Sequence, residues 1–170
     1  MDDRTYETLE LRALIALAAR HVQTLPGRLR MWNLRPTASR PDILRELEVT
    51  GECVSYLDTR GRFGLAGIDD PAPIMAALRV EGVRLEPRQI LSLERLIFVG
   101  KELREQVRSA AASGLYPHLL RISSGIPDLR QLLASIHGKI LPNGEMDDNA
   151  SPELRAIRKS LTERRNRIHR

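Results

Sequence analysis

The stretch PRQILSLERLIFVGKELREQVRSAAA, residues 87–112, is the longest internal helix that the sequence predicts. Its apolar residues recur at helical spacing and wrap around much of the helix instead of keeping to one stripe: Ile90, Leu91, Leu93, Leu96, Ile97, Val99, Leu103 and Val107. A helix that is apolar on most sides is surrounded by other elements. Ser113-Gly114 follows it, and Gly is favoured just past a helix end. We therefore expect this helix to be central to the fold.

The composition favours packing of helices on helices. Apolar residues make up 42% of the 170 residues and charged residues 29%, which is typical of a folded protein and not of a disordered one. Aromatic residues are few: one Trp, three Tyr and two Phe. The core must then consist mostly of Leu, Ile, Val and Ala, and we expect an all-α fold.

Outward from the central helix, caps and apolar periodicity predict seven further helical segments in an irregular bundle of about seven to eight helices. Their approximate ranges are 6–22, 24–33, 39–59, 71–80, 115–122, 127–137 and 151–170. Thr24 and Ser39 are the expected N-caps of the second and third segments. The third segment is expected to bury Ile43, Leu44, Leu47, Cys53, Val54 and Leu57. Residues 62–70 are Gly-rich and predict a loop.

Near the C-terminus, residues 139–148 predict one small hairpin-like turn. Asn143-Gly144 lies between the short extended segments 139–141 and 145–147. Asn-Gly favours tight turns of this kind, because both residues tolerate positive φ. This is the one strand-like feature that the sequence predicts.

The segment from residue 151 has a clear helix start. Ser151 is a good N-cap, Pro152 suits the first helical position, and Glu153 favours the positive end of the helix dipole. Leu154, Ile157, Leu161 and Ile168 then form a narrow apolar seam, with Arg164 in its middle. Spacing of this kind is typical of a coiled-coil or long lever helix. No helix-ending residue follows, so we expect the helix to be cut short at Arg170.

The net charge of +5 is concentrated in this last helix. Residues 1–150 contain 20 basic and 20 acidic residues, whereas residues 151–170 contain seven basic and two acidic ones. The candidate phosphate contacts are Arg158, Lys159, Arg164, Arg165 and Arg167. A solvated helix face is the alternative interpretation, and it is the more common one for such a run. No aromatic residue alternates with these cations, so stacking on bases is not indicated.

No catalytic, cofactor-binding or metal-binding residue is assigned from the sequence. Cys53 falls among apolar residues and is best interpreted as a buried structural cysteine. The four histidines do not show the spacing of a zinc site. Asp147-Asp148 is interpreted as turn and cap residues in preference to a magnesium or acid–base pair. Gly100-Lys101 and Gly138-Lys139 lack the remaining residues of a phosphate-binding loop.

Several features predict a cytoplasmic protein. Cys53 is the only cysteine, which argues against a disulfide framework. The start of the chain, Met1 to Arg4, is acidic, unlike a signal peptide. The longest apolar run, residues 13–19, is too short to cross a bilayer, so no membrane partner is expected.

Several short motifs, taken in order, resemble one known family. They are Thr8-Leu9-Glu10, Leu34-Arg35-Pro36-Thr37, Gly82-Val83-Arg84-Leu85 and, above all, the run from Gly144 to Leu154 with Ile157-Arg158. Together they resemble the N-terminal region of the second bacterial branch of the MutS-type ATPases, which acts against recombination. The resemblance runs from about residue 5 to residue 170, and its most specific part is D-x-A-S-P-E-L-x-x-I-R. Pro71 and Pro73 depart from the expected pattern.

The resemblance implies a helical core over residues 5–150 and the start of a basic lever helix over residues 151–170. Such a module is not catalytic and couples an ATPase to a clamp. The parent protein would bind ATP and Mg²⁺, and it would often be an endonuclease. Its implied partners are branched DNA and recombination intermediates, or the RNA of stalled ribosomes.

The residues leave a second function open. The apolar seam of the last helix could pair with another copy of the chain, which would make this a stand-alone dimerisation module without a nucleic-acid role. An enzyme that uses Cys53 or the histidines is the least favoured interpretation.

Overall fold

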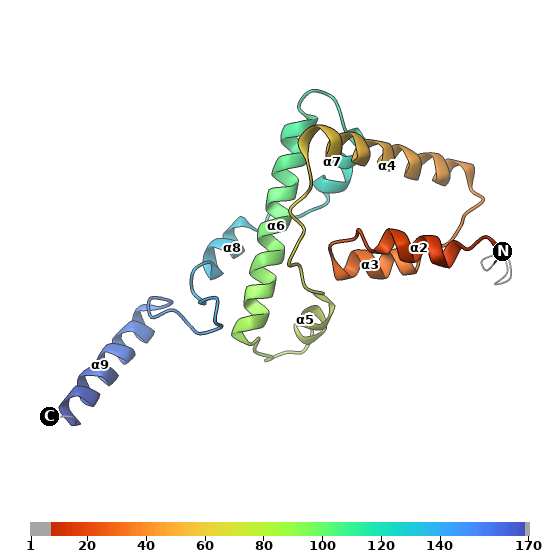
Figure 1. Cartoon of the computed structure of the whole chain (residues 1–170). Coiled ribbons are helices and arrows are strands. Elements are labelled where there is room, and N and C mark those ends of the chain that lie inside the picture. The colour runs from red at the N-terminus through yellow and green to blue at the C-terminus, as the bar shows by residue number, and fades with distance from the viewer. Residues whose placement is uncertain (1–7, 169–170) are drawn as a thin grey trace. The chain divides into compact units, whose positions relative to one another are not determined.

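The computed structural model describes residues 8–168, and in this range the protein is all-α, as predicted (Figure 1). Eight helices are present in the described range. They are α2 (Leu11–Ala19), α3 (Leu25–Trp32), α4 (Arg40–Arg60), α5 (Ala72–Ala77), α6 (Pro87–Ala111), α7 (Pro117–Ser124), α8 (Arg130–Ile136) and α9 (Pro152–Ile168). The long helix α6 matches the predicted central helix. Residues 62–70 contain no helix, as expected from their glycines.

The chain divides into two compact units. The first unit contains residues up to 70 together with 98–128, and the second contains residues 71–97 together with those from 129 onward. Helix α6 contributes its N-terminal part to the second unit and its C-terminal part to the first.

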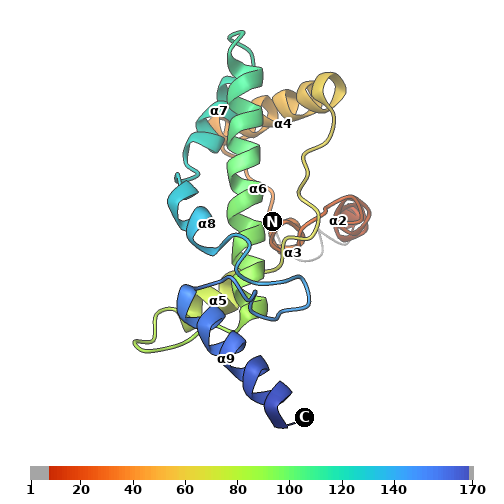
Figure 2. The ribbon, with the colours of Figure 1, turned by 90° about the vertical axis from the view of Figure 1, so that its left-hand side faces the viewer.

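The core of the first unit forms where α4 and α7 pack on the C-terminal half of α6 (Figure 2). Its buried residues are Tyr56, Val107, Ala110, Tyr116 and Leu119. The Tyr56 ring stacks on Phe63 at a centroid distance of 4.5 Å and meets Tyr116 edge-on at 5.6 Å. Half of the six Phe, Tyr and Trp residues of the chain therefore gather in this one cluster.

The prediction of which face of α4 is buried is wrong. Five of its six residues are 38–61% exposed: Ile43, Leu44, Leu47, Val54 and Leu57. Cys53 is half-buried, and the buried residue of α4 is Tyr56. The side of α4 that meets α7 carries Glu52, Tyr56 and Thr59, at spacings of four and three residues, and this side is opposite to the predicted stripe.

The N-terminal helices α2 and α3 pack on each other in the first unit. The N-cap prediction at Thr24 is confirmed, because its Oγ1 accepts a hydrogen bond from the Gly27 amide at 3.1 Å. The prediction that the Ser39 side chain caps α4 is wrong. Ser39 occupies the N-cap position of α4, but its hydroxyl bonds the Asp42 carboxylate instead of a backbone amide, and this bond lowers the pKa of Asp42.

Helix α2 is shorter than its predicted range of 6–22. It begins after Glu10, whose backbone is left-handed at φ 50°, and residues 6 and 7 lie outside the described part of the chain. The helix ends at Ala19, where the amides of Arg20, His21 and Val22 bond carbonyls three residues back. Such a tightened last turn is common at helix ends, and the sequence carries no signal for it.

In the second unit, the predicted hairpin-like turn is confirmed. Ile140 and Met146 form an isolated antiparallel bridge, and Ile140 is buried. The Gly144 amide donates to the Leu141 carbonyl at 2.8 Å, and Gly144 has a φ of 85°, a conformation that Gly adopts without strain. The Asn143 Oδ1 accepts from the backbone amide two residues on, at 2.9 Å. Gly144 thus takes the positive φ that the sequence predicts, whereas Asn143 supports the turn through its side chain and not through a positive φ.

A polar contact ties α8 to α6 within the second unit. His137 Nδ1 lies 2.6 Å from Glu94 Oε1, and the Glu94 side chain is only 15% exposed. His137 follows α8 directly, so this contact fixes the chain at the point where it turns toward the hairpin.

Candidate nucleic-acid interface

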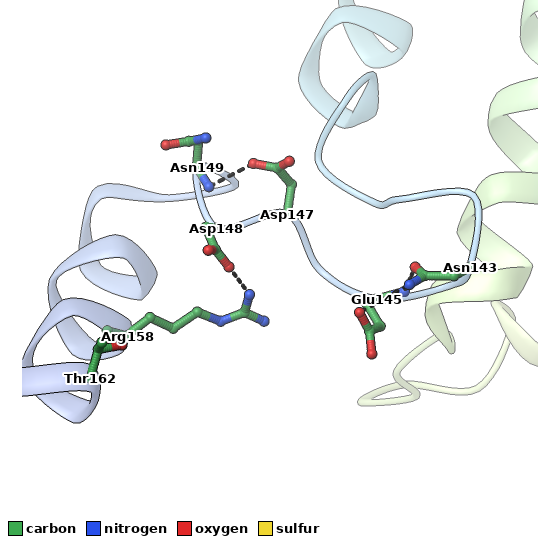
Figure 3. Close-up of polar contacts among 7 residues, drawn as sticks. All are labelled: Asn143, Glu145, Asp147, Asp148, Asn149, Arg158 and Thr162. Carbon is green, nitrogen blue, oxygen red and sulfur yellow. Dashed lines mark hydrogen bonds and ion pairs between the residues drawn. The ribbon is translucent and has the colours of Figure 1, made fainter. Parts of the chain in front are cut away.

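The loop before α9 holds its acidic residues in turn and ion-pair contacts (Figure 3). Asp147 Oδ1 accepts a hydrogen bond from the Asn149 amide at 2.7 Å, which closes a local turn. Asp148 forms an ion pair with Arg158, which lies in the second turn of α9. Asp147 thus acts as the predicted turn residue, whereas Asp148 pairs with a cation of α9 and the cap of that helix is Ser151.

The start of α9 is built as the sequence predicts. Ser151 Oγ accepts from the Leu154 amide at 3.1 Å, and the Ser151 carbonyl accepts from the amide of Arg155. Hydrogen bonds from its own backbone amide and from Ser151 hold the pKa of Glu153 below its usual value. The negative charge of Glu153 lies at the end of the helix where the dipole favours it.

All five predicted phosphate contacts lie on α9, and their side chains are exposed: Arg158, Lys159, Arg164, Arg165 and Arg167. They do not share a face. At 100° per residue, Arg158 and Arg165 lie on one flank of the apolar seam, Arg167 lies on the other flank, and Lys159 lies opposite the seam. A rod with positive charge on several sides suits contact with phosphates better than recognition of one base edge.

Four of the five cations are free to meet an anion. Arg158 is engaged by Asp148, but within the described residues no carboxylate pairs with Lys159, Arg164, Arg165 or Arg167. Their charge is not neutralised locally. We therefore regard Lys159, Arg164, Arg165 and Arg167 as the stronger part of the predicted set.

The apolar seam of α9 is also exposed. Ile157 and Leu161 are 58% and 57% exposed, and Leu154 is half-buried. Arg164 lines a shallow depression with Ile157 and Leu161, as its predicted place in the seam requires. The Ile168 side chain, the last member of the predicted seam, lies outside the described part of the protein.

The structure shows a second basic surface, which was not expected from the sequence. Arg104, Arg108 and Arg121 line a groove between α6 and α7 in the first unit. The four-residue spacing of Arg104 and Arg108 was a visible signal, because it places both on one face of α6. The position of Arg121 opposite them depends on how α7 folds back, and no local pattern predicts that.

Cys53 and two of the four histidines, His118 and His137, have structural contacts. Cys53 packs against the core of the first unit, and burial together with the nearby Glu52 charge raises the pKa of its thiol. His118 Nε2 lies 3.3 Å from a carboxylate oxygen of Glu48, and His137 contacts Glu94. In the described part of the chain, no three His, Cys, Asp or Glu residues gather as metal ligands would. His169 lies outside that part.

Known proteins similar to this chain are named Endonuclease MutS2. The chain matches that of Thermomicrobium roseum at 32% identity over 161 residues, 94% of this chain and 20% of that protein. It matches Endonuclease MutS2 of Alkaliphilus oremlandii at 26% identity over 99% of this chain and 21% of that protein. The chain is a MutS2-related sequence. The resemblance drawn from the motifs is thereby confirmed along nearly all of its length.

Endonuclease MutS2 of Pelotomaculum thermopropionicum is similar to the same extent, with 30% identity over 95% of this chain. No protein-family model matches the sequence. The chain spans about a fifth of the length of the curated MutS2 relatives it matches. Among residues 8–168, no helix has both the length and the apolar character that are needed to cross a membrane. The division between a core and a lever at residue 150 stays a prediction.

Proposed function

We propose that this chain is a non-catalytic helical module of a MutS2-type protein and that it contacts nucleic acid through the cations of α9. One observation carries the proposal: the entire net charge of +5 falls in residues 151–170, and the described cations among them are exposed. An exposed helix with a local excess of unpaired arginines attracts the phosphate backbone without regard to sequence. The similarity to proteins named endonucleases supports a substrate of this class.

We propose in addition that α9 acts as a lever between a helical core and the ATP-dependent parts of such a protein, in the cytoplasm. In this proposal ATP and Mg²⁺ are bound by those parts, and the nucleic acid is branched DNA or the RNA of a stalled ribosome. The support is the family resemblance and the architecture of α9, which has a firm N-terminal cap and an exposed seam.

The test is binding of fluorescein-labelled duplex and four-way branched DNA, followed by fluorescence anisotropy between 50 and 200 mM salt. If three phosphates are neutralised, the affinity should fall about 40-fold over this range. Replacement of Arg164, Arg165 and Arg167 by Glu should abolish most of the binding for all sequences alike. A preference for the branched over the duplex probe would favour DNA junctions as the partner.

The matched control changes the same number of charges elsewhere. Arg28, Arg30 and Arg35 are exposed residues in or just after α3, and their replacement by Glu gives the same net charge. This control should retain more affinity than the α9 variant. Equal reductions in the two variants, or no binding at 50 mM salt, would contradict the assignment of α9 as the contact.

The exposure of Ile157 and Leu161 favours a second candidate function, namely self-association through the seam of α9. In this alternative the module is a dimerisation element and the cations of α9 are a solvated face. The two candidates predict opposite responses to salt, because one needs the positive charge and the other must overcome it.

A further inference from the structure

An open groove of about 720 Å³ lies in the first unit, between the C-terminal half of α6 and α7. Apolar residues form part of its lining, among them Ala111, Pro117 and Leu120. Three arginines line the groove: Arg104 and Arg108 from α6, and Arg121 from α7. The groove is large enough for a few linked polar groups of a ligand, because sites for small ligands occupy about 300–1,000 Å³.

The three arginines carry charge that the protein does not neutralise. In the described part of the chain, no carboxylate pairs with Arg104, Arg108 or Arg121. The nearest acids on α6 are engaged elsewhere, because Glu102 and Glu105 lie 3.8 and 3.9 Å from the Lys101 ammonium. One lysine thus contacts both carboxylates of this turn, and neither carboxylate forms an ion pair with an arginine of the groove.

The position of α7, which forms one side of the groove, is fixed by its contacts with α4 and with the core of the first unit. Helix α7 is held on α4 by Glu52, whose carboxylate oxygens accept from the His118 and Leu119 amides at 3.1 and 2.9 Å. The buried residues Val107 and Leu119 join α6 and α7 to the same core. Arg121 is therefore presented from a helix whose position relative to the two arginines of α6 is set by packing.

The groove offers guanidinium groups as its donors. The hydroxyls of Ser123 and Ser124 also line it, but they already donate to the Leu120 and Arg121 carbonyls at 3.1 and 2.7 Å. A ligand in the groove must therefore accept its hydrogen bonds from arginine side chains. Planar guanidinium groups bind phosphate oxygens with two parallel hydrogen bonds, and Arg is favoured wherever phosphate is recognised in this way.

We propose that this groove binds the phosphodiester backbone of a nucleic acid, as a second contact site distinct from α9. Arg104 and Arg108 are four residues and therefore about 6 Å apart along the helix axis, so each can meet a different phosphate. Arg121 contacts the same strand from the other side. The apolar lining residues pack against sugar edges, and the lining of the groove includes no aromatic ring that would stack on a base. The inference rests on the proposed nucleic-acid function but on separate residues.

The direct test uses phenylglyoxal, which modifies arginine side chains, on the full 170-residue chain with and without an unlabelled 20-nucleotide DNA strand. Peptide mass spectrometry then measures the modification of each arginine. The strand should protect Arg104, Arg108 and Arg121, and it should leave the exposed Arg62 of the same unit unprotected. Protection confined to arginines of α9 would overturn the groove site while leaving the proposed function intact.

A binding measurement complements this readout. Replacement of the three groove arginines by Gln should lower the affinity for labelled single-stranded DNA about tenfold or more at 50 mM salt. It should also reduce the slope of log K against log salt by about 0.7 for each phosphate that the variant no longer neutralises. The matched control replaces Arg28, Arg30 and Arg62 by Gln, and far-ultraviolet circular dichroism checks that both variants remain folded.

The outcomes separate the two proposals. Abolished binding in the groove variant, with the α9 variant unchanged, supports the groove and contradicts α9 as the contact. Unchanged affinity and slope in the groove variant overturn the groove alone. If no DNA or RNA probe binds but polyglutamate does, and the groove variant no longer binds it, the groove recognises protein carboxylates and this proposal is wrong.

Discussion

At the scale of single residues, Glu52 has the most specific structural role in the first unit. Helix α7 has Tyr116 at its N-cap position, in a left-handed backbone conformation at φ 63°, and the Tyr116 side chain does not cap it. Glu52 of α4 supplies the missing acceptor and bonds two α7 amides. A carboxylate at this end of a helix also meets the positive end of the helix dipole.

We therefore predict that Glu52→Gln destabilises the first unit by about 1–2 kcal/mol, because two charge-assisted hydrogen bonds become weaker neutral ones. Urea denaturation followed by circular dichroism measures the change. Glu46→Gln is the matched control, since Glu46 is exposed on the same helix, more than one turn before Glu52. Equal stability of the two variants would contradict the capping role.

Caps made by neighbouring residues could be predicted from the sequence, whereas caps made across the fold could not. Thr24 and Ser151 cap their helices as predicted, because an N-cap of this kind is decided by atoms within three residues. The Glu52 cap joins residues 66 and 67 positions apart, so no local pattern could have revealed it. Ser39 stands at the predicted N-cap position, but its side chain accepts from no amide of α4, and its hydroxyl donates to the neighbouring Asp42 carboxylate.

At the scale of elements, the existence and order of the helices followed from the sequence, but the buried face of α4 did not. Helix α4 carries apolar residues on several sides, so periodicity alone left its orientation undecided. Its orientation is set by partners that follow much later in the chain, namely Tyr116 and α7. The arginine groove could not be predicted for the same reason, because it exists only once α7 packs beside α6.

The orientation of α4 gives a prediction that compares two truncations on one helix. Tyr56→Ala should cost about 3–5 kcal/mol, since it removes a buried aromatic ring that contacts Phe63 and Tyr116. Leu47→Ala should cost less than about 1 kcal/mol, because Leu47 is 61% exposed. Chemical denaturation of both variants checks this. A larger destabilisation by the Leu47 change than by the Tyr56 change would restore the face first expected from the sequence.

At the scale of the whole molecule, charge and apolar exposure fall on the same helix. Helix α9 has seventeen residues, which corresponds to a length of about 25 Å. Its exposed seam could pair with a second copy, but Arg164 lies in that seam, and each copy brings the same positive excess. Like charges on two paired helices repel each other. Self-association through α9 must therefore overcome electrostatic repulsion, whereas nucleic-acid binding gains from the same charge.

The two candidate functions should therefore respond to added salt in opposite directions. Salt screens repulsion and strengthens apolar pairing, so a dimer formed through α9 should become more populated between 50 and 500 mM salt. Nucleic-acid binding should weaken over the same range. We predict that sedimentation velocity at 50 mM salt finds the monomer of 19.2 kDa, and that any dimer at higher salt disappears in Leu161→Asp. Asn166→Asp, at an exposed position on the side of the same helix opposite the seam, is the matched control for the added charge. A dimer that forms at low salt and dissociates as salt rises would have to be held by opposite charges, and the seam of α9 could not be its interface.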